Sequence, residues 1–409
     1  MLEAAQPRHV VVIGASLAGI RTVQGLRSLG FDGRLTLIGA ESELPYDRPP
    51  LSKQLLAGEW SPDAVDGIRL GTRTELDAQD VALRLGVAAV GLDTDSRQVH
   101  LADGTAMSYD VLVVATGAAA RPSPWRPVSG VFQLRTLADA RALTGRLALG
   151  EPVVIVGGGF IGTEVAAAAI GRGCPVTVVD PLPEPMARLV GPEIAGSLVE
   201  LHRRHGVQTR FGTGVVAIKG RAGALTVELD SGERLIASTA VVGIGSVPAT
   251  DWLEGSGIEL DNGVITDGFL RAVGVQDVYA IGDVARWPHM GRGTEVRAEH
   301  WTNAGDQARH VASAIAKGVE EVYQPSDYVW SDQYDWKVNA VGWRDPAGRS
   351  IVVGDLEADG RAAVIHADAQ GITCGAVTVN WVRALNQARR QLPSGPSAES
   401  VADTVRQLL

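Results

Sequence analysis

Two glycine-rich turns, each between a short β-branched run and a predicted helix, constrain the fold of this chain more than any other feature. The first is Gly14-Ala-Ser-Leu-Ala-Gly19 and the second is Gly157-Gly-Gly-Phe-Ile-Gly162. A strand that leads through such a turn into a helix places the helix N-terminus against the pyrophosphate of a dinucleotide. Two such turns in one chain therefore predict two bound dinucleotides.

The composition of the 409-residue chain, 45% hydrophobic and 21% charged, is that of a globular protein with room for two or three domains. A formal net charge of -10 argues against non-specific binding to nucleic acid or to anionic membranes. No apolar run reaches the roughly 18 residues that cross a bilayer, and the first residues lack the apolar core of a signal peptide. We therefore expect a cytoplasmic protein with no nucleic-acid or membrane partner.

Buried parallel strands are predicted where short β-branched runs end at a glycine or an acidic residue. These runs cover 9–13, 34–38, 111–115, 152–156, 176–180 and 240–244. Each half of this series begins with a β-α-β unit, so the pattern indicates a two-copy duplication. From about residue 326 the pattern changes to alternating strands and turns, which predicts a mixed α+β region. We expect its last helix to be capped by Ser400 with Asp403.

The second turn is the complete form of the dinucleotide motif, since Gly157, Gly159 and Gly162 occupy all three positions. Asp180 closes the strand that follows, where a carboxylate accepts the ribose 2′-OH. Because that carboxylate repels a 2′-phosphate, the sequence favours NADH over NADPH. Arg188 follows eight residues later and leaves some tolerance for NADPH.

The first turn departs from the motif because Ser16 replaces its middle glycine. Serine is small enough to be tolerated where the backbone approaches a phosphate, but a structural glycine turn is the alternative. Glu41, just after the second strand, is the candidate ribose ligand of this turn. Its alternative is a solvated loop carboxylate.

Two cysteines, Cys174 and Cys374, lie far apart in the sequence and form no Cys-x-x-Cys pair. The chain therefore cannot supply its own dithiol relay. His202 and His205 are three residues apart, but no further cysteine or histidine accompanies them, so no metal site is predicted.

Six longer strings occur at specific places along residues 10–335: Pro45-Tyr-Asp-Arg-Pro-Pro-Leu-Ser-Lys53, Ala115-Thr-Gly-Ala-Ala-Ala-Arg121, Gly157-Gly-Gly-Phe-Ile-Gly-Thr-Glu164, Tyr279-Ala-Ile-Gly-Asp-Val-Ala285, Glu299-His-Trp301 and Trp330-Ser-Asp-Gln333. On these strings the chain resembles the FAD-dependent ferredoxin reductases that serve cytochrome P450s and Rieske-type dioxygenases. This putidaredoxin-reductase-like group belongs to the glutathione-reductase-fold flavoproteins.

The resemblance implies an α/β fold with two Rossmann-like dinucleotide-binding domains, the NAD domain inserted in the FAD domain, and a C-terminal α+β domain. The implied FAD-binding domain is discontinuous and covers 1–119 and 249–325. The NAD-binding domain would cover 120–248, and the C-terminal interface domain 326–409.

The resemblance also implies roles for particular side chains. Lys53 and Glu164 would pair near flavin N5, where the lysine stabilises the reduced flavin. Taken alone, Lys53 has the alternative interpretation of an ordinary exposed lysine, and Glu164 that of a carboxylate favoured at a helix N-terminus. Trp301 and Trp330 fall where the family places aromatic rings near the flavin, with core packing as the alternative. Asp283, at a helix N-terminus, would bind a ribityl hydroxyl.

The remaining implied contacts complete the two cofactor sites. His300 is expected to be structural rather than an acid–base group, since hydride transfer to a flavin needs no such base. The FAD contacts are Gly14, Ser16, Leu17, Ala18, Gly19, Glu41, Arg48, Lys53, Ala88, Thr116, Gly117, Arg121, Asp283, Glu299, His300 and Trp301. The NAD contacts are Gly157, Gly159, Phe160, Ile161, Gly162, Glu164, Asp180, Arg188 and Gly245.

The implied activity is that of an NADH:ferredoxin oxidoreductase containing FAD. Electrons would pass from NADH through FAD to a small acidic [2Fe–2S] or related ferredoxin that feeds a cytochrome P450 or a Rieske oxygenase. A basic patch near the flavin would steer this partner. The candidate residues of the patch are Arg292, Arg297, Arg383, Arg389 and Arg390. The alternative is that these arginines are scattered and solvated and form no patch. Monomer and homodimer both stay open.

Two other functions are weighed. An NADH oxidase or peroxidase of the same fold would reduce oxygen species, and its peroxidase members use a redox cysteine near the flavin. None occurs in residues 51–53. An apoptosis-inducing-factor-like flavoprotein with a binding role would predict a targeting segment and often a basic surface, and the sequence has neither.

Overall fold

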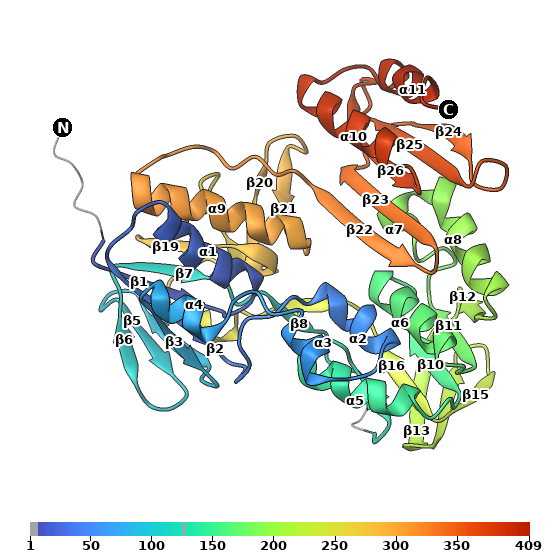
Figure 1. Cartoon of the computed structure of the whole chain (residues 1–409), viewed down its shortest axis with the longest axis horizontal. Coiled ribbons are helices and arrows are strands. Elements are labelled where there is room, and N and C mark those ends of the chain that lie inside the picture. Colours follow the sequence, from blue (N-terminus) through green and yellow to red (C-terminus); the bar gives the residue numbers. More distant parts are fainter. Residues whose placement is uncertain (1–6, 126–127) are drawn as a thin grey trace. The chain divides into compact units, whose positions relative to one another are not determined.

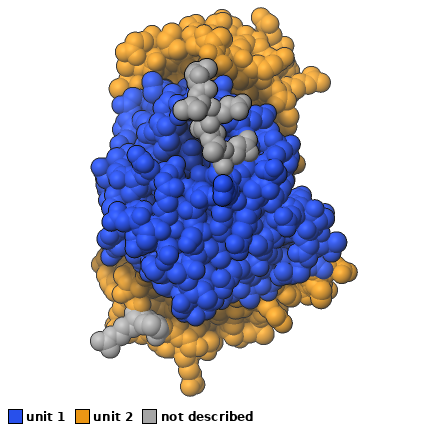
Figure 2. Space-filling model, turned by 90° about the vertical axis from the view of Figure 1, so that its left-hand side faces the viewer, with its two compact units in different colours: residues 1–47, 66–119, 246–326 blue, residues 48–65, 120–245, 327–409 orange. Residues whose placement is uncertain are grey.

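The computed structural model describes residues 7–125 and 128–409, and the side chains of Arg188 and Leu189 lie outside this description. The chain divides into two compact, discontinuous units (Figures 1 and 2). Unit 1 comprises Met1–Asp47, Asp66–Ala119 and Ser246–Ser326, and unit 2 comprises Arg48–Val65, Ala120–Gly245 and Asp327–Leu409. The three predicted domains and their boundaries stay a prediction.

Unit 1 is built on a five-stranded parallel sheet with a two-sided core (Figure 1). In β1, Val10 and Val12 pack with the helices on one face, whereas Val11 and Ile13 belong to the core on the other face. Burial on both faces explains why this strand reads as a continuous β-branched run. The strand order is β19 (Val278–Ala280), β7 (Val111–Val114), β1 (His9–Ile13), β2 (Arg34–Gly39) and β3 (Val81–Leu85).

Helices and smaller sheets complete unit 1. Helix α1 (Leu17–Ser28) follows the first glycine turn and packs against α9 (Trp301–Lys317). The other helical segments are α4 (Arg73–Ala78), η2 (Asp251–Leu253) and η3 (Gly282–Val284). The smaller sheets contain β4 (Ala89–Asp93), β5 (Gln98–Leu101) and β6 (Ala106–Ser108), and β18 (Val264–Ile265), β20 (Ala285–His289) and β21 (Thr294–Val296).

Unit 2 repeats the nucleotide-type sheet. Its parallel strands follow the order β12 (Gln208–Phe211), β11 (Val176–Asp180), β10 (Val153–Val156), β16 (Thr239–Val242) and β9 (Val131–Phe132). Counted from the strand before each glycine turn, both sheets share the order 3-2-1-4 of doubly wound folds. Helix α6 (Phe160–Gly171) follows the second turn, and an antiparallel sheet of β13 (Val215–Arg221), β14 (Ala224–Leu229) and β15 (Arg234–Ala237) adds to this core.

The last part of unit 2 is an antiparallel sheet that is covered on both faces. The order is β22 (Tyr328–Gln333), β23 (Trp336–Gly342), β26 (Thr373–Val379), β25 (Arg361–Ala367) and β24 (Ser350–Asp355). One face packs on α10 (Val382–Gln391) and α11 (Ala398–Arg406). The other face packs on α8 (Pro192–Arg204) of the nucleotide fold, so one core joins the two regions.

Short segments fill in the rest of the described chain. They are η1 (Pro49–Leu51), α2 (Gln54–Ala57), α3 (Pro62–Asp66), α5 (Leu137–Leu147), α7 (Ala187–Val190), η4 (Leu392–Ser394), β8 (Ala118–Ala120) and β17 (Ser246–Pro248). Among the described residues, no helix combines the length and apolar character that crossing a bilayer requires.

The predicted α/β fold with two parallel sheets and a C-terminal α+β region is confirmed, and two local expectations are wrong. Asp283 lies in the three-residue 3-10 turn η3 rather than at the start of an α-helix, because β20 follows directly. The cap of α11 is Ser397, whose hydroxyl accepts the Ser400 N–H at 3.3 Å. Ser400 is thus inside the helix.

Replacing Ser397 by alanine should lower the free energy of unfolding of unit 2 by about 1 kcal/mol, the usual value of a side-chain N-cap. Ser400→Ala is the matched control and should leave stability unchanged. Urea denaturation followed by circular dichroism measures both variants. Equal loss in both would mean that Ser397 is not the cap.

Candidate functional site

The first glycine turn brings the backbone so close to itself that larger residues do not fit. Gly14 has φ +117°, and a Cβ there would stand 2.1 Å from the Ala115 carbonyl oxygen. A Cβ on Gly19 would stand 1.9 Å from the Gly14 carbonyl oxygen. The Gly14 N–H donates to the Ile38 carbonyl at 2.7 Å, which fixes the turn on β2. Ser16 is the extended N-cap residue, and Leu17 and Ala18 begin α1.

The second glycine turn, which lies in unit 2, has nearly the same backbone angle and close approaches as the first. Gly157 has φ +115°, and a Cβ there would stand 2.2 Å from the Gly243 carbonyl oxygen. A Cβ on Gly162 would again stand 1.9 Å from the carbonyl of the first glycine. At the middle position, a Cβ on Gly159 would meet nothing within 4 Å, so this N-cap faces open space. Phe160 and Ile161 begin α6.

These two turns fit the pyrophosphate groups of two dinucleotides. In each unit a parallel strand ends at a cradle that only glycine can form, and a helix N-terminus follows. The first backbone N–H groups of a helix have no intrahelical acceptor and carry partial positive charge, which suits a phosphate. Open space at Gly159 is what the backbone approach to a pyrophosphate requires.

Asp180 is held by the backbone of the second turn. Its Oδ2 accepts the Gly158 N–H at 2.7 Å and its Oδ1 accepts the Leu182 N–H at 2.8 Å. The side chain is 9% exposed, and each carboxylate oxygen retains a lone pair. The carboxylate thus orients the turn, and its role in ribose recognition stays a prediction. Arg188 is in α7, and its side chain is outside the described part.

Lys53 and Glu164, which the family resemblance pairs, lie together in unit 2. Lys53 Nζ is 2.7 Å from Glu164 Oε1, with side chains 22% and 5% exposed. Glu164 is the fifth residue of α6, so it lies beyond the first helical turn. Its interpretation as a helix-terminal carboxylate is therefore wrong. The pair is instead a buried carboxylate facing a partly accessible ammonium group.

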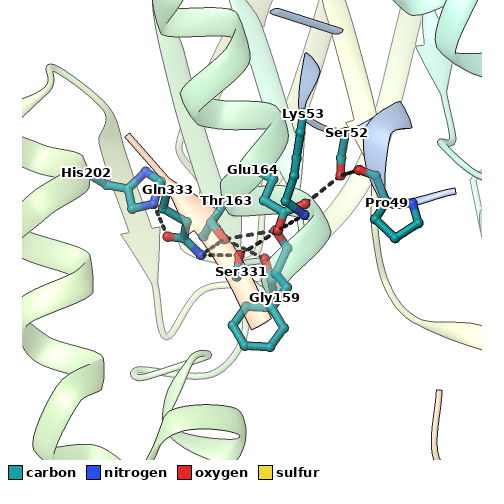
Figure 3. A network of polar contacts seen from close by, with 10 residues as sticks. Pro49, Ser52, Lys53, Gly159, Thr163, Glu164, His202, Ser331 and Gln333 are labelled. Atoms are coloured by element: carbon teal, nitrogen blue, oxygen red, sulfur yellow. Dashed lines mark hydrogen bonds and ion pairs between the residues drawn. The ribbon is translucent and has the colours of Figure 1, made fainter. Parts of the chain in front are cut away.

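Two hydroxyl groups that the sequence did not single out complete the shell of Glu164 (Figure 3). Ser52 donates to Oε2 at 2.5 Å and Ser331 donates to Oε1 at 2.5 Å. With Lys53, the carboxylate accepts three hydrogen bonds in a nearly dry environment, so the positions of both its oxygens are fixed. Both serines belong to strings that carry the family resemblance, and that membership is the signal that could have found them.

The remaining predicted FAD contacts in unit 1 lie on loops around its sheet. Glu41 Oε2 accepts the Tyr46 hydroxyl at 2.6 Å, and Thr116 donates to the Ala249 carbonyl at 2.9 Å. Gly117, with φ +68°, accepts the Ala249 N–H at 3.0 Å. Ala88 accepts from the backbone of residue 102, between β3 and β4. These contacts give each residue a structural partner, and their cofactor roles stay predictions.

The segment from Asp283 to Trp301 is tied together by Arg297. Its guanidinium is 2.7 Å from Glu299 and donates to the Asp283 carbonyl at 3.1 Å. Its side chain is 11% exposed, so Arg297 does not present an open positive charge to a partner. His300 is the N-cap residue of α9 and Trp301 its first residue; the indole N–H donates to Asp47 Oδ1 at 2.6 Å.

Unit 2 also contains further residues that are predicted to contact the cofactors. Arg48 donates to the Arg135 carbonyl, and the Arg121 N–H donates to the carbonyl of Gly245, which has φ +102°. Trp330 stacks on Tyr328 in β22 with ring centroids 5.9 Å apart. Trp301 and Trp330 thus belong to different units.

Among the described residues, no group of three histidine, cysteine, aspartate or glutamate side chains could hold a metal.

The fold and the site together define an α/β protein with two dinucleotide sites. The family model described as pyridine nucleotide-disulphide oxidoreductase matches residues 8–308, and the one described as reductase C-terminal matches residues 328–408. The chain belongs to the pyridine nucleotide-disulphide oxidoreductase family, within its ferredoxin reductases. The predicted family, fold class and cofactors are thereby confirmed.

Individual relatives agree with this assignment. The chain is 39% identical to rhodocoxin reductase of Rhodococcus erythropolis over 85% of this chain and 81% of that protein. It is 37% identical to the ferredoxin–NAD(+) reductase component of the anthranilate 1,2-dioxygenase system of Burkholderia cepacia, over 96% of both chains. The crystal structure of the covalent putidaredoxin reductase–putidaredoxin complex matches with a TM-score of 0.90 at 31% identity, covering 98% of this chain and 96% of that one.

Replacing Asp180 by alanine should raise the ratio of kcat/KM for NADPH to that for NADH by about tenfold. The reason is that the repulsion between the carboxylate and the 2′-phosphate of NADPH, about 1.4 kcal/mol for a tenfold change, is removed. The KM for NADH should also rise, because the Gly158 and Leu182 N–H groups lose their acceptor. Asp230→Ala, which removes a comparable acceptor from the Gly214 N–H, is the control and should leave the ratio unchanged. An unchanged ratio in Asp180→Ala would exclude Asp180 from ribose recognition.

Proposed function

We propose that this protein takes electrons from NADH at the second glycine turn and passes them through FAD to a small acidic [2Fe–2S] ferredoxin. That ferredoxin would serve a cytochrome P450 or a Rieske oxygenase, as the names of the relatives suggest. The observation that carries the proposal is the ionic pair of Lys53 and Glu164 at 2.7 Å, in which Glu164 lies on the helix that follows the second dinucleotide turn. When bound, FAD accepts two electrons together and gives them up singly.

The chain's own groups would provide the electrostatics for this exchange. Glu164 is fixed by Ser52 and Ser331, so Lys53 is held in one place although its stem is long. A fixed ammonium group in a partly dry site stabilises negative charge that develops beside it, and needs no reorganisation when that charge appears. The carboxylate offsets the desolvation of the ammonium before the reaction.

The cysteines argue against a thiol-based peroxidase. Cys174 is 2% exposed and its Sγ donates to the Leu147 carbonyl; Cys374 is 8% exposed and lies in β26. Burial raises the pKa of both thiols, which suppresses the reactive thiolate. Two unpaired cysteines also support a reducing compartment such as the cytoplasm.

The candidate docking surface for the acidic ferredoxin is α10. Arg383, Arg389 and Arg390 are exposed on this helix, and the Arg389 guanidinium lies 4.8 Å from the centroid of the Tyr328 ring. Complementary charge would speed association and make it sensitive to salt. Because the whole chain carries a net charge of -10, such attraction would have to be local.

The function is tested by reducing the holoprotein with NADH without oxygen and mixing it with a [2Fe–2S] ferredoxin or with oxygenated buffer in a stopped-flow instrument. The expected result is rapid bleaching of the ferredoxin and slow reaction with oxygen. Fast oxidation by oxygen without ferredoxin reduction would instead support an oxidase.

Lys53→Met, which retains the aliphatic stem, should lower the limiting rate of flavin reduction by NADH about a hundredfold, the usual effect of losing one charge-stabilising group. Lys219→Met is the matched control, since Lys219 forms a surface ion pair with Glu228 at 2.8 Å in the same unit. Its rate should equal that of the wild type. A wild-type rate in Lys53→Met would remove Lys53 from the reaction.

A further inference from the structure

A chain of buried polar groups continues behind Glu164, on the side away from Lys53 (Figure 3). Ser331 contacts Gln333 Nε2 at 3.3 Å, and Gln333 Oε1 lies 2.7 Å from His202 Nε2. Gln333 Nε2 also lies 3.0 Å from the Thr163 hydroxyl. Ser331 and Gln333 are fully buried, Thr163 and His202 are each 4% exposed, and none of these groups belongs to the predicted cofactor sites.

The direction of every hydrogen bond in this chain follows from the charge of Glu164. A carboxylate only accepts, so Ser331 must use its single proton on Glu164 Oε1. The Ser331 oxygen can then only accept from Gln333, which places the amide nitrogen toward Ser331 and Thr163. Thr163 directs its own proton to the Gly159 carbonyl at 3.0 Å. The Gln333 oxygen therefore faces His202 and can only accept.

These assignments fix the tautomer of His202 with the proton on Nε2. Its Nδ1 then accepts from the Tyr334 hydroxyl, 3.3 Å away, and the Tyr334 ring is stacked on His205 with centroids 3.7 Å apart. Burial lowers the pKa of His202, against the smaller opposing effect of its bond to Gln333. The neutral ring is thus the favoured state, as the single Nε2 proton requires.

We propose that His202 is a positioning residue for the Lys53–Glu164 pair, acting through the amide of Gln333 and the hydroxyl of Ser331. By donating to the Gln333 oxygen, His202 holds the amide in the one orientation that leaves the Ser331 proton free for Glu164. With the amide reversed, its oxygen would compete for that proton and Glu164 would lose one of its three donors. This inference rests on the proposed role of Lys53 and Glu164.

The test compares three variants of the FAD-containing protein. His202→Leu removes the donor, and the limiting rate of flavin reduction by NADH should fall about tenfold, as for one lost hydrogen bond to a charged group. The KM for NADH should stay unchanged, because His202 does not touch the glycine turn. His202→Gln restores an amide donor and should recover most of the rate.

His366→Leu is the control for a purely structural effect. His366 is another buried histidine of unit 2, 3% exposed and bonded to Ser350 at 3.0 Å. The His366→Leu variant should be less stable than the wild type, but its limiting rate of flavin reduction by NADH should be unchanged. Equal rate losses in His202→Leu and His366→Leu, or no recovery in His202→Gln, would overturn the proposal.

A second readout does not depend on any variant or on turnover. In the wild-type holoprotein labelled with ¹⁵N-histidine, the His202 resonances should show a protonated Nε2 and an unprotonated Nδ1. The Nδ1–H tautomer would overturn the proposal even if His202→Leu fails to fold. If the wild-type flavin is not reduced by NADH at all, the proposed function fails, whereas the tautomer result still decides whether His202 orients the amide.

Discussion

The contact between the carbonyl of the first glycine and the α-carbon of the third glycine in each turn is the constraint on which the two nucleotide folds depend. In both units a methyl group at the third position would stand 1.9 Å from that carbonyl oxygen, well inside van der Waals contact. The helix can therefore pack directly on the strand that precedes it, with its N-terminus at the edge of the sheet. The close packing of helix on strand and the position of the phosphate cradle follow from this approach.

The two glycine turns have different surroundings. In unit 1 the middle position of the turn is Ser16, and the loops nearby are joined by Arg297, Glu299 and Asp283. In unit 2 the middle position is an open glycine, and the helix that follows carries Glu164. The second copy thus combines a nucleotide cradle with an ion pair, and this combination gives the chain its proposed redox role.

Features with local causes were predictable from the sequence, whereas features that join distant segments were not. β1 and β11 occur at the predicted residues because a β-branched run ending at a turn needs no other information. The cap of α11 was misplaced by three residues because Ser397 and Ser400 satisfy the same local rule, and only the bridge between Ser397 and Ile372, far away in sequence, selects between them. Lys53 and Glu164 were paired by family resemblance. The contacts of Glu164 with Ser331, and of Gln333 with His202, join residues more than 130 positions apart, and no local pattern encodes them.

The antiparallel sheet at the end of the chain supplies two of the side chains behind Glu164. Ser331 and Gln333 come from β22, and the same sheet shares a core with α8, which carries His202. The final region therefore completes the hydrogen-bond shell of a carboxylate that the nucleotide fold carries. A chain ending before β22 would retain both glycine turns, but Glu164 would lose the Ser331 donor and the strand that helps to exclude water from it.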